Sequence, residues 1–269
     1  MKKIKGIVFL DIDGTIIDRI RGLTAPTIKT VYGVKELIVN GYAVIIASGR
    51  PKCLLPKEVL ALGANGYLLC NGAYCQLDGE VIFADTFELA EVEKLERYCL
   101  GFSQALVFRE DQDAVYVNRK DNELFADFVR GWNMAPEQFV LPDGEHAVYM
   151  LMTAFKNEGE CALFAEHFAK EFAVARQYGF TSFDVSKKGI NKGVGIARLL
   201  QALGLDRNDA YAFGDGLNDL EMMQAVGHSY AMANACKEVL ALAEQTTLNV
   251  LDDGFYEAIV KDGLIRPMD

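Results

Sequence analysis

The sequence has few of the residues on which thiolate metal sites, disulfides and histidine-based catalysis depend. Its 269 residues include three scattered histidines and six cysteines, and the cysteines form no Cys-x-x-Cys pair. A zinc cluster or a Ser-His-Asp triad is therefore a poor fit. The cysteines are typical of small buried side chains in a reducing compartment. No apolar run approaches membrane-spanning length and no signal-peptide pattern opens the sequence, so we expect a cytoplasmic protein without a membrane partner.

Positive charge is also in short supply. The chain has 27 Lys and Arg against 38 Asp and Glu, which gives a net charge of −11. Binding to a nucleic-acid backbone needs a basic surface, so nucleic acid is excluded as the main partner. Hydrophobic residues make up 51% of the sequence, which is enough for one large domain or two smaller ones with a sizeable core.

Three short apolar runs predict strands that are buried on both faces, as in a parallel sheet. They are Gly6–Leu10, Tyr42–Ala47 and Gly66–Cys70. The alternation of strand and helix returns later, with a helix expected over Lys192–Leu203 and a strand over Ala210–Phe213. This rhythm predicts an α/β fold with a parallel sheet and right-handed crossovers.

The middle of the chain has a different character. Residues 85–184 contain amphipathic helical patterns and pairs of runs that resemble antiparallel strands. They carry 9 Lys and Arg against 19 Asp and Glu, a net charge of −10, whereas the remainder carries 18 against 19, a net charge of −1. This asymmetry supports a domain boundary. We therefore expect residues 85–184 to form an inserted α+β domain, and residues 1–84 and 185–269 to form the core.

The first predicted strand runs directly into two carboxylates, Asp11 and Asp13, which precede Gly14. Asp-Gly is a common turn dipeptide, and Asp78-Gly79 is typical of such a turn in a hairpin. However, the carboxyl end of a parallel strand is where open α/β sheets place their ligands. Two carboxylates this close repel each other unless a cation or a proton lies between them, and oxygen ligands suit Mg²⁺. A calcium EF-hand loop would need its glycine at position six, whereas Gly14 is at position four.

Other polar residues lie in loops that follow or adjoin predicted strands. Each has an ordinary interpretation as a capping turn, a solvated lysine or a helix N-cap. They are Ser48, Gly49, Lys192, Asp215, Asn218 and Asp219. Lys192 lies in the first turn of a predicted helix, where a cation opposes the helix dipole, and a bound anion would remove that conflict. Together with Asp11 and Asp13, these residues could supply a Mg²⁺ site and a phosphate cradle.

In their order along the chain, DIDGT, Ser48, Lys192 and GDGLND (Gly214–Asp219) resemble the four motifs of the haloacid dehalogenase-like (HAD) hydrolases. The spacing from GINKG to MANA is similar to that of the Cof-type phosphatases in this superfamily. The resemblance implies a Rossmann-like core with an α/β cap inserted between the second and third motifs. It further implies a Mg²⁺-dependent phosphatase that acts on a small phosphorylated metabolite, such as a sugar phosphate.

The same resemblance assigns a role to each motif residue. Asp11 would be the nucleophile that forms an aspartyl-phosphate, and Asp13 the general acid. Mg²⁺ would be held by Asp11, the backbone carbonyl of Asp13, and Asp215, with Asp219 in support. Phosphate binding falls to the residues of the other loops, which are Ser48, Gly49, Lys192 and Asn218. Lys187 and Lys188 lie close to Lys192 in the sequence, and we choose Lys192 because it precedes a helix within the Lys-Gly pair.

Two other functions fit the same motifs. One is a phosphomutase of the same superfamily, and the other is a non-catalytic sugar-phosphate sensor, against which the intact pair of Asp11 and Asp13 argues. The sequence leaves open which metabolite is the substrate, what the oligomeric state is and which cap residues touch the leaving group. Candidates for that contact, each explained equally well as a surface or core residue, are Arg109, Arg119, Trp132, Arg176 and Tyr178.

Overall fold

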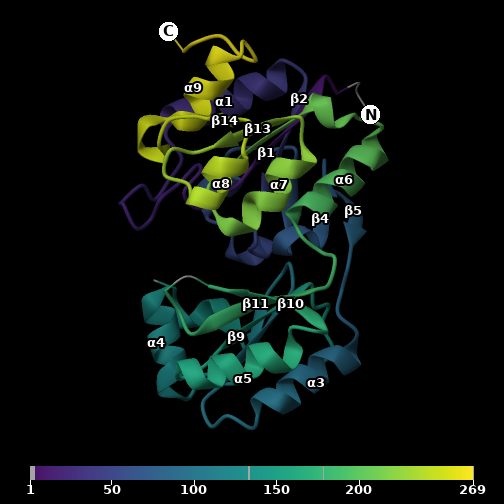
Figure 1. The fold of residues 1–269 in the computed structure, drawn as a ribbon, viewed down its shortest axis with the longest axis vertical. Coiled ribbons are helices and arrows are strands. Elements are labelled where there is room, and N and C mark those ends of the chain that lie inside the picture. The colour runs from purple at the N-terminus through teal and green to yellow at the C-terminus, as the bar shows by residue number, and fades with distance from the viewer. Residues whose placement is uncertain (1–3, 133, 178, 269) are drawn as a thin grey trace. The chain divides into compact units, whose positions relative to one another are not determined.

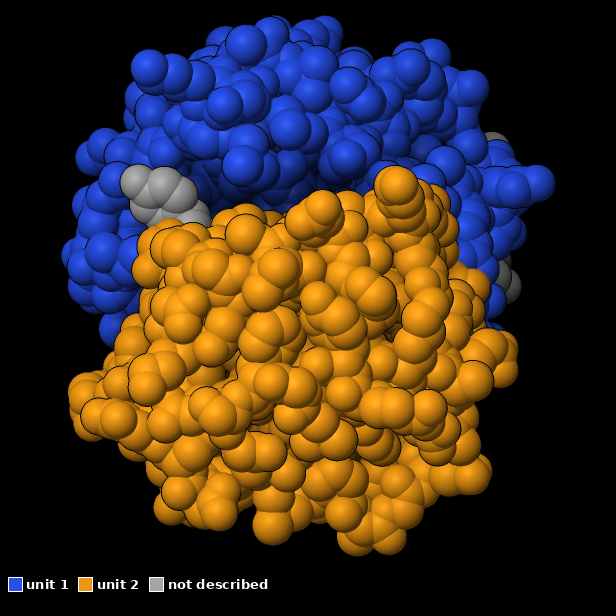
Figure 2. Space-filling model, turned by 60° about the horizontal axis from the view of Figure 1, so that its bottom comes forward, with its two compact units in different colours: residues 1–49, 55–83, 191–269 blue, residues 50–54, 84–190 orange. Residues whose placement is uncertain are grey.

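The computed structural model of the chain describes residues 4–132, 134–177 and 179–268. The chain divides into two compact units (Figure 2), of which unit 1 comprises residues 1–49, 55–83 and 191–269, and unit 2 comprises residues 50–54 and 84–190. The main segment of unit 2 thus begins one residue before the expected boundary and ends six residues after it, and residues 50–54, which were expected in the core, also group with unit 2. The reason at the second boundary is strand β11 (Ser182–Lys187), which pairs along its length with strands of unit 2 and would be divided by a cut after residue 184.

Unit 1 is built on an eight-stranded sheet with the order β14-β13-β12-β1-β2-β3-β4-β5. The strands are β1 (Gly6–Leu10), β2 (Tyr42–Ala47), β3 (Gly66–Leu69), β4 (Tyr74–Leu77), β5 (Glu80–Ala84), β12 (Ala210–Gly214), β13 (His228–Ala231) and β14 (Gln245–Thr246). The pairs from β14 to β3 are parallel, and β4 runs antiparallel to β3. β1 and β2 begin and end as the sequence predicts, whereas β3 ends one residue early because Cys70 adopts a positive φ.

Helices cover both faces of this sheet (Figure 1). They are α1 (Ile28–Val39), α2 (Lys57–Leu60), α6 (Lys192–Leu203), α7 (Leu220–Ala225), α8 (Lys237–Leu242) and α9 (Gly254–Lys261). On one face, Phe9 of β1 lies in a buried cluster with Leu199 of α6 and Met222 of α7. On the other face, Phe213 of β12 meets Phe255 of α9 edge-on, with ring centroids 5.1 Å apart. These buried strands and flanking helices confirm the predicted α/β fold.

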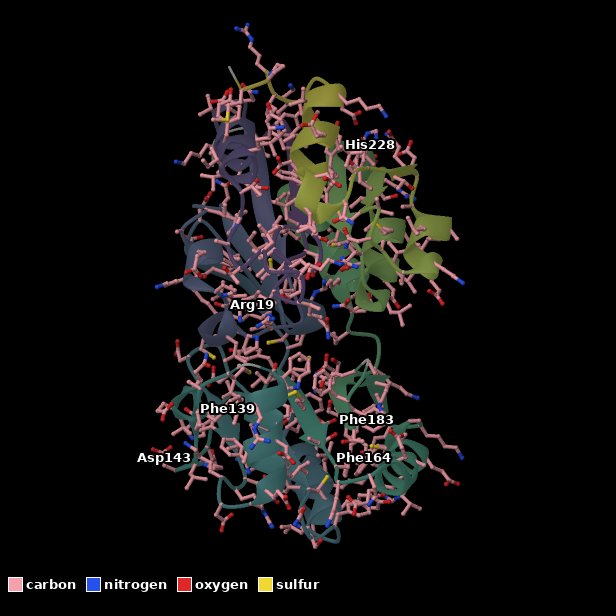
Figure 3. All side chains as sticks on the ribbon, turned by 90° about the vertical axis from the view of Figure 1, so that its left-hand side faces the viewer. Arg19, Phe139, Asp143, Phe164, Phe183 and His228 are labelled. Carbon is pink, nitrogen blue, oxygen red and sulfur yellow. The ribbon has the colours of Figure 1, made fainter. Side chains whose placement is uncertain are left out.

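Unit 2 is an α+β structure around a six-stranded sheet with the order β10-β11-β9-β6-β7-β8. Besides β11, its strands are β6 (Leu106–Glu110), β7 (Val115–Val117), β8 (Phe139–Val140), β9 (Met150–Ala154) and β10 (Phe172–Arg176), and its helices are α3 (Leu89–Cys99), α4 (Glu123–Gly131) and α5 (Glu158–Phe168). Two apolar clusters form on its two faces. In one, Phe164 of α5 and Phe183 of β11, labelled in Figure 3, stack with ring centroids 5.7 Å apart. In the other, Phe139 of β8 packs against Phe128 of α4.

The candidate leaving-group contacts of unit 2 have structural partners within that unit. Both carboxylate oxygens of Glu96 accept from the guanidinium of Arg109, at 2.7 and 2.6 Å. Trp132 stacks on Phe180 with ring centroids 4.6 Å apart. The remaining pairs are Arg119 with the carbonyl of Ser103 and Arg176 with Glu158. Tyr178 lies outside the described residues. Among the described residues, no helix combines the length and apolar character needed to cross a membrane.

Two glycines at the start of α6 let that helix approach its neighbours closely. A Cβ atom at Gly193 would lie 2.3 Å from the backbone carbonyl oxygen of Glu221 in α7. A Cβ atom at Gly195 would lie 2.7 Å from Leu68 of β3 and 3.1 Å from the Cα of Gly72. Real Cβ atoms do not come so near to a backbone oxygen, so the spacing of these glycines serves helix packing, which positions the first residue of α6.

We expect Gly193→Ala to lower the free energy of unfolding by about 1–3 kcal/mol, because the added methyl group collides with backbone that cannot move aside. In an open helix the same change would be stabilising, by roughly 0.5–1 kcal/mol. Urea unfolding of the purified variants measures the difference.

The matched control is Ala197→Gly on the exposed side of the same helix, which should cost roughly 1 kcal/mol through helix propensity alone. Alanine should therefore be favoured at position 197 and glycine at position 193. A Gly193→Ala protein as stable as the wild type would show that the close approach imposes no constraint.

Candidate active site

Three of the sequence-predicted site residues lie at the carboxyl ends of neighbouring parallel strands in unit 1. Asp11 follows β1, Ser48 follows β2 and Asp215 follows β12, and these three strands are adjacent in the sheet. The backbone continues the ladder at two of these positions: the amide of Asp11 donates to Phe213 at 3.0 Å, and the amide of Ser48 donates to Leu68 at 2.9 Å. Sheet pairing therefore brings together loops that are separated by up to about two hundred residues.

Lys192, the first residue of α6, is the centre of the site. Its side chain is completely buried, and its ammonium donates to Asp11 Oδ1 and to Asp219 Oδ1, both at 2.6 Å. Burial alone would lower the pKa of Lys192, but the charges of Asp11 and Asp219 outweigh it and raise that pKa. Lys192 is therefore a fixed cation. The two carboxylates also resolve the conflict between this charge and the dipole of α6.

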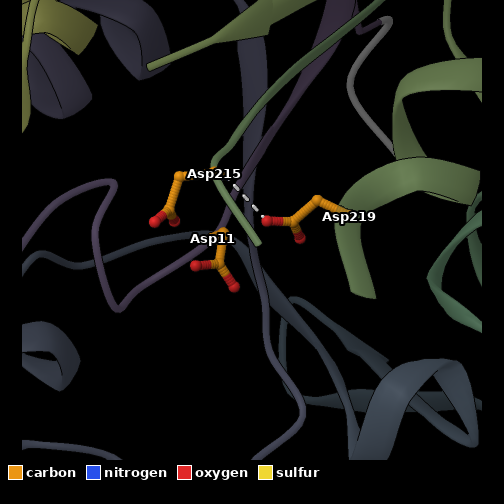
Figure 4. A group of neighbouring side chains, drawn as sticks. All are labelled: Asp11, Asp215 and Asp219. Carbon is orange, nitrogen blue, oxygen red and sulfur yellow. Dashed lines mark hydrogen bonds between the residues drawn. The ribbon is translucent and has the colours of Figure 1, made fainter. Parts of the chain in front are cut away.

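The three carboxylates Asp11, Asp215 and Asp219 form a compact group (Figure 4). Each offers one oxygen atom, and these atoms all lie within 4.8 Å of one another. The second oxygen of Asp219 accepts from the backbone amides of Asp215, at 2.9 Å, and Gly216, at 3.0 Å. Three carboxylates against one ammonium leave an excess of negative charge. Clustered oxygen ligands of this kind fit a hard divalent cation such as Mg²⁺.

Burial and mutual repulsion raise the pKa values of two of these carboxyl groups. Burial, followed by the charge of Asp219, raises the pKa of the Asp11 carboxyl well above its ordinary value, although Lys192 acts in the opposite direction. For the same two reasons the pKa of Asp215 rises to about 7. The fold therefore holds these carboxylates where their charges are costly, which is common at functional sites.

Gly14 explains how the first and last motif loops come so close. Its φ is +86°, and a Cβ atom on it would lie 2.0 Å from a carboxylate oxygen of Asp215. Two further residues hold Asp215 and were missed by the sequence analysis. The hydroxyl of Thr15 donates to Asp215 at 3.3 Å, and the amide of Asn234 donates to the carbonyl of Gly14 at 2.7 Å and to Asp215 at 3.4 Å. Both lie inside the motif stretches, but only the fold reveals their partners.

The structure also bears on the choice between neighbouring lysines. Lys187 donates to the carbonyl of Thr86, and Lys188 donates to the carbonyl of Lys170, all within unit 2. Lys192 is the lysine that meets the carboxylates. Asp13 differs from Asp11 in being exposed, and it lies outside the group of three clustered carboxylates.

A strained segment follows β3 at the same edge of the sheet. Cys70, Asn71 and Gly72 have φ values of +51°, +51° and +94°, so three consecutive residues are left-handed and two of them carry side chains. A left-handed conformation costs roughly 1–2 kcal/mol for such a residue. The amide of Asn71 donates to the carbonyl of Ser48 at 3.2 Å, and its side-chain oxygen accepts from Asn218 at 3.3 Å. The sequence analysis assigned these residues no part in the site.

Comparison with known proteins identifies the family of this chain. The family model of the haloacid dehalogenase-like hydrolases matches residues 8–259. The protein YkrA of Bacillus subtilis (strain 168), whose name provisionally describes it as a phosphatase, is 30% identical over 97% of this chain and 98% of its own. YitU of the same organism, named as 5-amino-6-(5-phospho-D-ribitylamino)uracil phosphatase, is 27% identical over 92% of this chain and 94% of its own. A crystal structure of a hypothetical protein from Geobacillus kaustophilus HTA426 superposes with a TM-score of 0.87, at 28% identity, covering 97% of this chain and all of that one.

The match covers the sheet, the motif loops and the inserted unit alike, since the family model begins in β1 and ends in α9. The chain therefore belongs to the haloacid dehalogenase-like hydrolases and is a phosphatase of their Cof type.

Proposed function

We propose that this phosphatase is Mg²⁺-dependent and hydrolyses a small phosphorylated metabolite, such as a sugar phosphate, through an aspartyl-phosphate on Asp11. The observation that carries the proposal is the buried contact of Lys192 with Asp11 and Asp219 beside a third carboxylate, Asp215. This arrangement gives one carboxylate that can attack, one permanent cation and a group of oxygen ligands. It supports phosphoryl transfer in particular, because that reaction depends mainly on positioning and on charge stabilisation.

Asp11 is the nucleophile in this proposal. Its carboxylate attacks the phosphorus atom, a new bond forms between a carboxylate oxygen and phosphorus, and the bond from phosphorus to the leaving oxygen breaks. Asp11 must be ionised to attack. The ammonium of Lys192, 2.6 Å away, favours that charged form against the burial that disfavours it, and the same ammonium is placed to neutralise an oxygen of the phosphoryl group.

Asp13 is the general acid and base. It gives its proton to the leaving oxygen in the first step. In the second step it takes a proton from the water molecule that attacks the aspartyl-phosphate, so that inorganic phosphate and the Asp11 carboxylate are released. The exposure of Asp13, in contrast to the burial of Asp11, suits a group that exchanges protons with the leaving group and with water.

The donor set fits Mg²⁺. The ligands would be Asp11, Asp215 and the backbone carbonyl of Asp13, and Asp219 would support them through its bonds to the backbone amides of Asp215 and Gly216. The ion would supply positive charge that lets an anionic phosphoryl group approach an anionic nucleophile. Ser48 and Gly49 after β2, with Lys192 and Asn218, form the proposed phosphate cradle.

The substrate class is proposed from chemistry and from the relatives. The relative YitU is named for a phosphorylated ribityl compound, which is a small polyol phosphate. Unit 2 is the proposed cap that selects the leaving group, since it interrupts the chain between Ser48 and Lys192 and contains none of the proposed site residues. Residues 85–184 carry a net charge of −10, which disfavours leaving groups that bear further negative charge.

The wild-type protein should release phosphate from a panel of small phosphate esters when Mg²⁺ is present and not after chelation, and Asp11→Asn should release none. An amide cannot form the aspartyl-phosphate. Because the buried charge of Asp11 is unfavourable, the variant should keep or gain thermal stability. Phosphate assays and thermal unfolding of the same preparations test both parts.

The control for this variant is Asp253→Asn, which makes the same change in unit 1 at a residue that bonds Thr27 and is remote in sequence from the motifs. It should retain wild-type turnover. An Asp11→Asn protein with near-wild-type phosphate release would disprove the nucleophile assignment.

Asp13→Asn should reduce turnover by about 10²–10⁴-fold, which is the usual contribution of general acid–base catalysis. The loss should be larger for an alkyl phosphate than for an aryl phosphate, because a good leaving group needs less protonation. Comparing kcat for the two substrates tests the role, and an equal loss for both would argue against an acid.

Binding of Mg²⁺ should weaken as the pH falls. The ion binds the deprotonated carboxylates, and a proton with a pKa of about 7 on Asp215 competes with it. One such proton raises the apparent dissociation constant about tenfold between pH 8 and pH 6. Calorimetry in buffers of different ionisation enthalpy should show proton release, and Asp215→Asn should bind more weakly with a flatter pH dependence. A pH-independent affinity of the wild-type protein would contradict the proposed ligand set.

A further inference from the structure

Asn71 lies at the edge of the sheet that carries the motif loops, but it belongs to none of the motifs and has no role in the proposed mechanism. It follows β3, the strand next to β2 in the sheet, and it stands in the middle of three left-handed residues. Backbone strain of this kind persists where the surrounding structure enforces it, and it gathers at functional sites. The surroundings here are two loops of the proposed phosphate cradle, so the strain has a candidate purpose.

The side chain of Asn71 touches both of those loops. Its Oδ1 accepts a hydrogen bond from Nδ2 of Asn218 at 3.3 Å. The same Oδ1 packs against Gly49, since a Cβ atom on that glycine would lie 3.0 Å away. The backbone amide of Asn71 donates to the carbonyl of Ser48 at 3.2 Å. One residue therefore links the loop after β2 with the loop that carries Asn218.

The direction of the bond to Asn218 has a chemical consequence. An amide side chain has a donor end and an acceptor end, and an anion needs the donor. In the observed pair, Oδ1 of Asn71 is the acceptor and Asn218 turns Nδ2 toward it. The other end of Asn218 then lies over Gly216, where a Cβ atom would come within 2.8 Å of Oδ1 of Asn218. The reversed amide would present a carbonyl oxygen to the oxygens of a phosphoryl group and repel them.

We propose that Asn71 is a positioning residue of the phosphoryl-transfer site, which fixes the side-chain amide of Asn218 as a phosphate donor and holds it in register with the Ser48 loop. The proposal rests on the proposed function and deepens it. The left-handed backbone directs the side chain of Asn71 at both loops. This positioning role explains why the chain tolerates the strain. Asn is suited to the position because it enters the left-handed region more readily than most residues and carries an acceptor.

The test is Asn71→Gly, which keeps the left-handed backbone without strain and removes only the side chain. Thermal stability should be unchanged or higher. With Mg²⁺ present, kcat/KM for an aryl phosphate and affinity for inorganic phosphate should each fall about tenfold, as expected if Asn218 loses its hydrogen bond to a charged ligand. The matched control is Asp78→Gly, a left-handed residue with φ +47° in the β4–β5 turn, which should change neither quantity.

A double-mutant cycle with Asn218→Ala separates positioning from a general disturbance of the site. If Asn71 acts through Asn218, Asn71→Gly should cause little further loss once Asn218 is alanine. The proposal is overturned if the two losses multiply, if Asn71→Gly keeps wild-type turnover and phosphate affinity, or if the wild-type protein binds no phosphate. Failure of the proposed function gives a different result, because the wild-type protein would then release no phosphate from any ester. The double-mutant cycle, measured by affinity for inorganic phosphate, would still test the role of Asn71.

Discussion

The buried ammonium of Lys192 is the interaction on which the arrangement of the site depends. It bonds at once to Asp11, which follows the central strand β1, and to Asp219, which stands at the start of α7. A buried charge is strongly unfavourable unless it is paired, and each of its two carboxylates would be left without its cation if Lys192 were lost. The three side chains therefore hold one another in place, and their contacts also position the end of β1 and the starts of α6 and α7. A buried triad of this kind contributes little net stability, so its value lies in geometry.

The close contacts between the segments around Lys192 follow from the need to pair its ammonium with both carboxylates. For the ammonium to reach both carboxylates, α6 must lie against α7, and the DIDGT loop must lie against Asp215. Glycine is present at both contacts, at Gly193 beside Glu221 and at Gly14 beside Asp215, where a Cβ atom would collide. The left-handed turn at Cys70–Gly72 makes the third close contact, because a Cβ atom at Gly72 would lie 2.3 Å from the carbonyl oxygen of Asn191, just before α6 begins. Small side chains and strained backbone thus surround one charged contact.

Local patterns in the sequence predicted most of this fold, because buried strands and capped helices leave short-range signals. β1, β2 and α6 begin and end where hydrophobic runs and helix periodicity place them. A boundary after residue 184 would divide β11, because this strand joins the second sheet through pairing with β9 and β10 that no local pattern reveals. The same limit applies to the site. Motif residues were visible in order, but Thr15, Asn71 and Asn234 acquire their partners only when loops distant in sequence meet.

Electrostatics connects this architecture to phosphate chemistry. Asp11, Asp215 and Asp219 together carry three negative charges against the single positive charge of Lys192, so the bare site would repel a phosphoryl group, which itself carries about −2 near neutral pH. A divalent cation would neutralise this net charge of −2, and it would relieve the repulsion that adds to burial in raising the pKa of Asp215 to about 7. In the proposed function, the carboxylates would have to bind their cation before a phosphoryl group could approach without repulsion, so substrate binding would be coupled to metal binding through charge.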